Sequence, residues 1–271
     1  MTTEKQAPKL ISSTLENGIG ILLMGGSKLN AFGTPLVGEM IEALEEFKQR
    51  SVRAVIIRAL PGSKVFSTGH DVGELAAGKD PLGPNDPLCL LAKKIRELPC
   101  PVIAMVEGTV WGGACEIVLS CDIVCMAETL TNKAGAEEPV TLTITPAKLG
   151  VPYSVSGLKT LSSVIPLHIL KELLFTASSL TARRAYELGV VNHVVPTPEL
   201  EALVLGIAQR IAALAPLSHK MHKQILGLDT SAMERFKDML EIKRESVYSS
   251  ADYAEGLTAF REKRQPVFVG R

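Results

Sequence analysis

The order of apolar and polar residues along the chain predicts strands that alternate with helices. Six stretches are expected to be strands, at residues 19–24, 52–59, 65–66, 101–106, 122–126 and 141–145; the first five are mainly apolar, and the last alternates between polar and apolar residues. Between them, apolar residues recur with helical spacing over residues 36–47 and 88–98. This alternation predicts an α/β domain in which strands pair in parallel.

Two glycine-containing stretches follow predicted strands and expose backbone N–H groups. They are S-T-G-H-D at residues 67–71 and W-G-G-A-C-E at residues 111–116. Adjacent glycines that open a helix leave unpaired N–H groups at its positive end, where negative charge is favoured. One N–H from each stretch, converging on a carbonyl oxygen, would form a two-donor oxyanion hole. The alternative is a tight turn into a buried helix, with the glycines serving packing alone.

The chain is predicted to be mainly helical from residue 168 onward. Ser231 and Glu234 have the spacing of a capping box, which would begin one of these helices. The last predicted helix carries an apolar stripe on one face, formed by Tyr253, Leu257 and Phe260. A stripe of this kind is expected to pack on a neighbour, either within the chain or in another subunit.

Composition and charge exclude several classes of function. The 271 residues include 29 basic and 29 acidic side chains, and this balance argues against a nucleic-acid surface. No apolar run approaches the ~20 residues of a membrane helix, and the polar N-terminus lacks a signal-peptide core. The five cysteines are an odd number without two ligand pairs, so we expect buried reduced thiols rather than a metal site. These features predict a cytoplasmic protein.

Three motifs in combination resemble the crotonase (enoyl-CoA hydratase/isomerase) superfamily. They are F-S-T-G-H-D at 66–71, P-V-I-A-M-V-E-G-x-x-x-G-G-A-C-E at 101–116 and L-T-A-R-R-A-Y-E-L-G-V-V-N-H-V-V at 180–195. The resemblance implies a ββα spiral core, placed at residues 10–195, and a C-terminal helical trimerisation region at residues 196–271. It also implies an acyl-CoA thioester substrate, a homotrimer or dimer of trimers, and no bound cofactor or metal.

The resemblance also implies candidate site residues. The oxyanion donors would be the backbone N–H groups of His70 and Gly113, and the 67–71 loop would hold the CoA adenine. The candidates for contacts with the CoA ester are Lys28, Ser67, Thr68, Gly69, Asp71, Gly112, Phe260 and Lys263. Among them Lys28 would contact a CoA phosphate, whereas Phe260 and Lys263 would reach the CoA of a neighbouring subunit.

One departure from the hydratases of this superfamily favours a decarboxylase. Those hydratases usually carry two glutamates; the first corresponds to Glu116, but Thr145 and Pro146 stand where a proline and the second glutamate would be. Syn-hydration needs a paired acid and base, whereas loss of CO2 from a malonyl thioester mainly needs stabilisation of the enolate oxygen. In the decarboxylase pattern, Tyr153 would orient or desolvate the departing carboxylate and Thr145 would line the same pocket. We therefore expect decarboxylation of methylmalonyl-CoA or a close malonyl-CoA derivative.

Two other functions stay open at the level of sequence. Residues 131–140 look like an insertion, part of a polar segment at 127–140 that we expect to be a surface loop. Glu137 or Glu138 of this insertion could instead supply an acid for an enoyl-CoA hydratase, isomerase or acyl-CoA hydrolase, and the insertion could displace Thr145. A catalytically idle CoA-binding trimer is the remaining alternative.

Three of the candidate residues also have a purely structural interpretation. Tyr153 could be a buried tyrosine in a turn after a proline. Glu116 could be a structural carboxylate rather than an acid. His70 is expected to act through its backbone, so its imidazole could simply be exposed.

Overall fold

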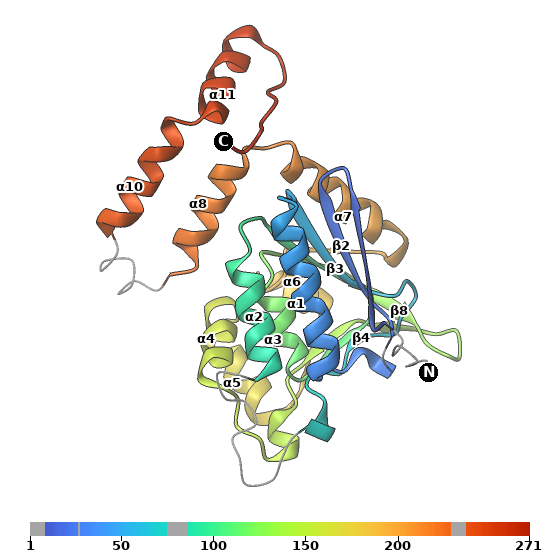
Figure 1. The fold of residues 1–271 in the computed structure, drawn as a ribbon. Helices are drawn as coiled ribbons and strands as arrows, with labels where there is room; N and C mark the ends of the chain where they lie inside the picture. The colour runs from blue at the N-terminus through green and yellow to red at the C-terminus, as the bar shows by residue number, and fades with distance from the viewer. Residues whose placement is uncertain (1–8, 27, 75–85, 229–236) are drawn as a thin grey trace, which may run out of the picture.

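The computed structural model describes residues 9–26, 28–74, 86–228 and 237–271. Figure 1 shows a core of sheets and helices, from which an arm of helices near the C-terminus projects. The core contains one large cluster of buried apolar side chains, drawn from the strands and from the helices packed on them. The predicted α/β class is confirmed.

A six-stranded sheet forms the centre of the core. Its strands, in spatial order, are β1 (Ile11–Glu16), β2 (Ile19–Met24), β3 (Ala54–Ala59), β5 (Val102–Val106), β7 (Ile123–Ala127) and β12 (His193–Val195). All neighbours pair in parallel except β1 and β2, which form an antiparallel hairpin. The four predicted strands of this sheet are confirmed. Strand β1 was not predicted, because its sequence I-S-S-T-L-E lacks apolar alternation; the Asn17–Gly18 turn, with φ of 50° and 76°, pairs it with β2.

A second, four-stranded sheet carries the loops described below as the candidate site. Its strands, in spatial order, are β11 (Ser179–Thr181), β10 (Thr141–Thr143), β6 (Thr109–Trp111) and β4 (Val65–Ser67). Strands β4, β6 and β10 run parallel, and β11 pairs antiparallel with β10. Because parallel strands end at the same edge, the segments that follow β4, β6 and β10 emerge close together.

Seven α-helices and three short 3-10 helices of the described chain belong to this core. They are α1 (Thr34–Gln49), α2 (Pro87–Glu97), α3 (Ala114–Leu119), α4 (Val155–Val164), α5 (Leu167–Thr176), α6 (Ala182–Glu187), α7 (Thr197–Ala212), η1 (Lys28–Asn30), η2 (Val72–Glu74) and η3 (Pro146–Leu149). Helix α2 packs between α1 and α3, and every residue of α3 is buried. Helix α7 packs against β3, β5 and β7. The division into regions 10–195 and 196–271 stays a prediction.

The expectation of a loop at residues 127–140 is wrong. Strands β8 (Thr129–Thr131) and β9 (Glu137–Pro139) form an antiparallel hairpin there. The Asn132 side chain stabilises its turn by accepting hydrogen bonds from the N–H groups of Ala134 and Ala136. A two-stranded ribbon of polar residues has no apolar alternation, so sequence periodicity gave no sign of it. The predicted surface position is confirmed, since residues 133–139 are exposed.

The projecting arm consists of α8 (Pro216–Leu226), α10 (Lys237–Tyr248) and α11 (Ala251–Glu262) (Figure 1). The predicted apolar stripe of the last helix is exposed, with Phe260 84%, Tyr253 42% and Leu257 41% accessible. The proposed capping box at Ser231 and Glu234 lies outside the described residues. Within the described chain, no single helix has the length and hydropathy of a membrane span; only α7 and α8 together reach them, across a 105° bend.

Candidate active site

The two glycine-containing stretches meet at the edge of the four-stranded sheet. Gly69 lies against the second stretch so closely that a methyl group there would be 2.6 Å from the Trp111 carbonyl oxygen and 2.7 Å from the Gly113 nitrogen. A methyl group on Gly113 would in turn be 3.6 Å from the His70 nitrogen. Gly69 also has a φ of +87°, a conformation that side chains other than glycine rarely adopt. The predicted convergence of the two stretches is therefore present.

Hydrogen bonds hold the backbone around this contact but do not involve the N–H groups of His70 and Gly113. The Ser67 hydroxyl donates to the Asn30 carbonyl at 2.6 Å and accepts from the Gly69 N–H at 3.0 Å. The Gly112 N–H donates to the Thr143 carbonyl at 2.8 Å. Within the described residues, the N–H groups of His70 and Gly113 have no hydrogen-bond acceptor. Two neighbouring free donors of this kind can bind an oxygen that gains negative charge.

A cavity opens in front of these two donors. Its polar lining includes Thr68, His70, Asp86, Gly112, Gly113, Glu116, Thr145 and Tyr153, and its apolar lining includes Leu88, Leu149 and Val151. Four separate segments of the sequence contribute these residues, from the loop after β4 to the stretch that runs from η3 into α4. All five residues predicted to be catalytic line this one cavity.

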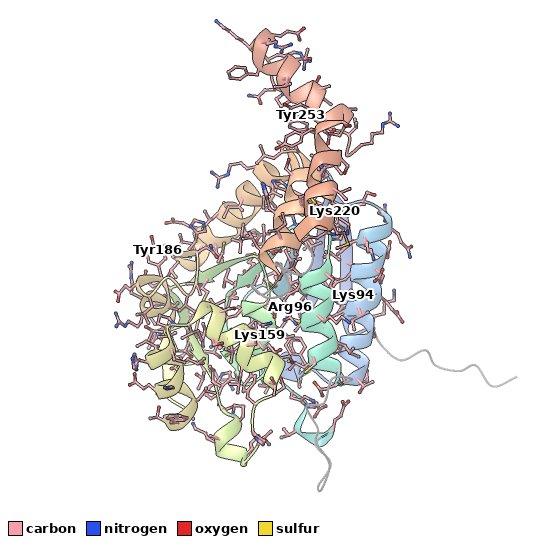
Figure 2. The ribbon with its side chains drawn as sticks, turned by 90° about the vertical axis from the view of Figure 1, so that its left-hand side faces the viewer. Lys94, Arg96, Lys159, Tyr186, Lys220 and Tyr253 are labelled. Atoms are coloured by element: carbon pink, nitrogen blue, oxygen red, sulfur yellow. The ribbon has the colours of Figure 1, made fainter. Side chains whose placement is uncertain are left out.

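Glu116 is a buried carboxyl group in the wall of the cavity. Its side chain lies in the first turn of α3, the residue is only 1% exposed, and its Oε1 has no hydrogen-bond partner in the described chain. Burial raises the pKa of this carboxyl from 4.5 to about 7, with a smaller opposing effect from Arg96. Arg96, labelled in Figure 2, donates to the hydroxyls of Ser120 and Thr160 instead of pairing with Glu116. Glu116 is therefore largely protonated below neutral pH.

This raised pKa predicts the stability of a Glu116→Gln variant. A carboxyl with a raised folded-state pKa binds more protons folded than unfolded, so its destabilising effect is absent below pH 4.5 and grows until pH exceeds about 7. The full effect is on the order of 3 kcal/mol. We expect Glu116→Gln to raise Tm by several degrees at pH 8 and to leave Tm unchanged near pH 4. Thermal unfolding at both pH values measures this, and an unchanged Tm at pH 8 would contradict it.

Tyr153 and Thr145 face the cavity from the segments around η3. The Tyr153 hydroxyl donates a long hydrogen bond of 3.4 Å to the Gly112 carbonyl. Burial holds the pKa of this phenol well above its usual value, so the hydroxyl keeps its proton and acts as a donor. Gly157 of α4 makes room for it, because a methyl group there would lie 2.6 Å from the Tyr153 ring and 2.5 Å from Glu116 Oε2. Thr145 lies in the cavity wall as well, despite the β8–β9 hairpin that precedes it in the sequence.

The His70 imidazole is not exposed, contrary to the alternative left open by the sequence. Its side chain is 11% accessible and lies between two oxygen acceptors. Nδ1 is 3.0 Å from the Asp71 carbonyl oxygen, and Nε2 is 2.7 Å from Asp86 Oδ2. Sequence reasoning missed Asp86, although an aspartate directly before a proline that opens a helix is a recognisable N-cap.

Of the other residues predicted to bind the CoA ester, some line the cavity and others lie away from it. Thr68 lines it, whereas Ser67 is fully buried and Asp71 uses its carboxylate to cap the Gly73 N–H. Lys28 begins η1, but its side chain lies outside the described residues. Phe260 and Lys263 lie at the end of α11 in the projecting arm. A single chain does not bring these two residues to the cavity.

The two acidic residues of the β8–β9 hairpin are not in this cavity. Glu137 accepts a hydrogen bond from the Thr131 hydroxyl, and Glu138 accepts one from the Asn132 amide, both at 2.7 Å. Glu137 lines a different cavity, together with Lys64 and Glu107. The hairpin therefore places no second acid beside Glu116.

All five cysteines are thiols that form no disulfide bond, and four of them are buried. Across the described ranges, no group of three or more histidine, cysteine, aspartate or glutamate side chains is arranged to hold a metal ion.

Comparisons with known proteins give the same assignment as the motifs. Residues 14–271 match the enoyl-CoA hydratase/isomerase family. Methylmalonyl-CoA decarboxylase of Escherichia coli (strain K12) is 42% identical over 253 residues, which cover 90% of this chain and 92% of that protein. Carnitinyl-CoA dehydratase of Salmonella heidelberg (strain SL476) is 32% identical over 253 residues, which again cover 90% of this chain and 92% of that protein. A solved structure of methylmalonyl-CoA decarboxylase in complex with 2-nitronate-propionyl-CoA is 40% identical and superposes with a TM-score of 0.75, covering 98% of this chain and all of that one. The chain belongs to the enoyl-CoA hydratase/isomerase, or crotonase, family.

Proposed function

We propose that this protein decarboxylates methylmalonyl-CoA, or a close malonyl-CoA derivative, to the corresponding acyl-CoA. The observation that carries the proposal is the pair of free N–H groups of His70 and Gly113 at a cavity that holds only one unpaired carboxyl, Glu116, within the described residues. The similarity to methylmalonyl-CoA decarboxylase along 90% of the chain supports the same reaction.

The reaction follows from the geometry of these two donors. The thioester carbonyl oxygen accepts hydrogen bonds from the His70 and Gly113 N–H groups. The bond between C2 and the carboxylate breaks, CO2 leaves, and the electron pair moves through C2 to the thioester oxygen, which becomes an enolate. One donor of this kind is typically worth ~3–4 kcal/mol in the transition state, and no base must first remove a proton. A bound cofactor or metal is therefore not required, and coenzyme A enters as part of the substrate.

Two side chains have assigned roles in the remaining steps. The neutral Tyr153 phenol orients the carboxylate that leaves, and Thr145 lines the same part of the cavity. The enolate then takes a proton at C2, and Glu116 is the proposed donor because its carboxyl is protonated up to about pH 7. Proton transfer from Glu116 to C2 completes the acyl-CoA and leaves a carboxylate that solvent reprotonates.

A hydratase is the second candidate, and the cavity argues against it. Hydration needs an acid and a base on the same face of the substrate. Glu137 and Glu138 are engaged within their hairpin, and Asp86 is paired with His70. Glu116 would therefore act alone.

The proposal extends to the assembly and location of the protein. A homotrimer, or a dimer of trimers, would cover the exposed apolar stripe of α11 and allow Phe260 and Lys263 to contact a neighbour's CoA. Within one subunit, Lys28 and the 67–71 loop would contact the CoA. A cytoplasmic location is supported by the five cysteines, none of which forms a disulfide bond.

The function is tested by turnover of two isomeric substrates, methylmalonyl-CoA and succinyl-CoA. We expect propionyl-CoA from methylmalonyl-CoA and no change in succinyl-CoA, whose carboxylate is not on the carbon beside the thioester carbonyl. Loss of CO2 from succinyl-CoA would leave the negative charge on C3, one carbon too far from the carbonyl to form an enolate that the two donors can stabilise. Mass measurement of the CoA thioesters reads both outcomes. Turnover of succinyl-CoA, or no propionyl-CoA, would contradict the proposal.

A further inference from the structure

We propose that Asp86 is a positioning residue, which keeps His70 as an imidazolium and thereby places a fixed positive charge behind one of the two oxyanion donors. The inference rests on the proposed function, because the charge acts on the same developing oxyanion. Asp86 directly precedes α2 and belongs to none of the three sequence motifs that resemble the family.

The two acceptors around the imidazole determine its protonation state. The Asp71 carbonyl and the Asp86 carboxylate have no proton to give, so Nδ1 and Nε2 must both donate, at 3.0 Å and 2.7 Å. An imidazole that donates from both nitrogens is an imidazolium. The hydrogen bond with Asp86 is also the largest cause of a raised pKa of His70, and the carboxylate of Glu74 adds a smaller effect in the same direction.

Asp86 is itself held by a second set of contacts. Its side chain is 2% accessible, and its Oδ1 accepts hydrogen bonds from the N–H groups of Leu88 and Cys89, at 2.9 Å and 3.4 Å, as the N-cap of α2. The two oxygens therefore have separate tasks, because Oδ1 caps the helix and Oδ2 faces His70. Through this arrangement α2, a helix of the core, holds the ring of His70.

This fixed ring acts on the oxyanion through the backbone and through its charge. The imidazolium and the donating N–H belong to the same residue, and the ring is tied to Asp71 on one side and to Asp86 on the other. The donor is thus held before the substrate arrives, and a positive charge lies beside the oxygen that becomes negative. Preorganised charges at a water-poor site stabilise such a transition state without reorganisation.

The variant Asp86→Asn is expected to remove the positive charge of His70 while keeping the N-cap of α2. Asparagine caps helices as well as aspartate, so its Oδ1 can keep the bonds to α2. Its amide NH2, in place of Oδ2, donates to Nε2 and favours the neutral tautomer that still donates from Nδ1 to the Asp71 carbonyl. We expect kcat for methylmalonyl-CoA at pH 7.5 to fall about tenfold while KM changes by less than about twofold.

Two controls make the inference falsifiable. His70→Ala keeps the backbone N–H but removes the ring, and we expect the double variant His70→Ala/Asp86→Asn to be no slower than His70→Ala alone. NMR of 15N-histidine-labelled protein, which has five histidines, should find His70 protonated at pH 7.5 in the wild type and neutral in Asp86→Asn. The His70 resonance is assigned by its loss in His70→Ala.

The outcomes separate this inference from the proposed function. A neutral His70 in the wild type, or an unchanged kcat in an Asp86→Asn protein whose His70 is neutral, would overturn the role of Asp86. If the wild type turns over no methylmalonyl-CoA, the proposed function fails. Binding of 2-nitronate-propionyl-CoA, an anionic mimic of the enolate, then replaces kcat as the readout. In that case equal affinity of the wild type and Asp86→Asn for the nitronate would overturn the inference.

Discussion

Replacing Gly69 by alanine is expected to lower kcat/KM for methylmalonyl-CoA by at least about 100-fold. The added methyl group would lie 2.6 Å from the Trp111 carbonyl oxygen and 2.7 Å from the Gly113 nitrogen, both of them backbone atoms. It must therefore push apart the two stretches that carry the oxyanion donors. Loss of a single such donor typically costs 10²–10³ in rate, so disruption of the pair should cost at least as much.

A matched variant isolates this effect from the strain of the turn. Gly62 has a similar φ, +76° against +87° for Gly69, but a methyl group there meets no atom within 4 Å. The Gly62→Ala protein should be destabilised by the same backbone strain, of order 1 kcal/mol, but should keep the activity of the wild type. Steady-state kinetics and thermal unfolding of the two variants give the comparison. Equal activity of folded Gly69→Ala and Gly62→Ala would contradict the assignment of the donors.

Tyr153→Phe is expected to lower kcat by about 10- to 100-fold, which corresponds to the ~1.5–3 kcal/mol of a hydrogen bond to a charged group. In the part of the chain that the structure describes, the only hydrogen bond of the phenol is the long one of 3.4 Å to the Gly112 carbonyl, so the hydroxyl is available to a substrate carboxylate. Phenylalanine keeps the ring that packs beside Gly157, and the cavity shape should be preserved. A phenol that acts only in packing would leave kcat unchanged.

The control for this variant is a tyrosine on the surface. Tyr186 of α6, labelled in Figure 2, is 48% exposed and does not line the cavity. Tyr186→Phe should therefore leave kcat and KM unchanged. Comparing kcat of the two variants, with product identified by mass, measures the contribution of the Tyr153 hydroxyl. Equal kcat values for the two would contradict the role proposed for Tyr153.

Much of the fold followed from apolar patterning because the central strands are buried on both faces. Strands β3 and β5 contain only buried residues, and all of these are apolar except Arg58 of β3; such nearly continuous apolar runs are recognisable without structural information. The β1–β2 hairpin was only half predicted, and the β8–β9 hairpin was missed. Strands β1 and β9 of these hairpins are mostly exposed and polar. The two hairpins therefore form through turn geometry and cross-strand hydrogen bonds rather than through burial.

The candidate site was predictable to the extent that it depends on the backbone. The glycines of the two stretches indicated exposed N–H groups, and both stretches lie at one sheet edge as parallel strands require. Side-chain pairs could not be predicted in the same way. The contact between His70 and Asp86 spans 16 residues, including a segment without periodicity, and the burial that raises the pKa of Glu116 depends on α4 closing over α3.

The proposed use of the two N–H donors is decarboxylation rather than hydration. Incubating the purified protein with methylmalonyl-CoA and with crotonyl-CoA in parallel, and measuring the masses of the CoA thioesters, distinguishes the two reactions. Propionyl-CoA should appear and crotonyl-CoA should be left unchanged, because the other carboxylate that lines the cavity within the described residues, Asp86, is paired with His70, while Glu137 and Glu138 are engaged within their hairpin. Hydration of crotonyl-CoA without formation of propionyl-CoA would contradict the proposed decarboxylation.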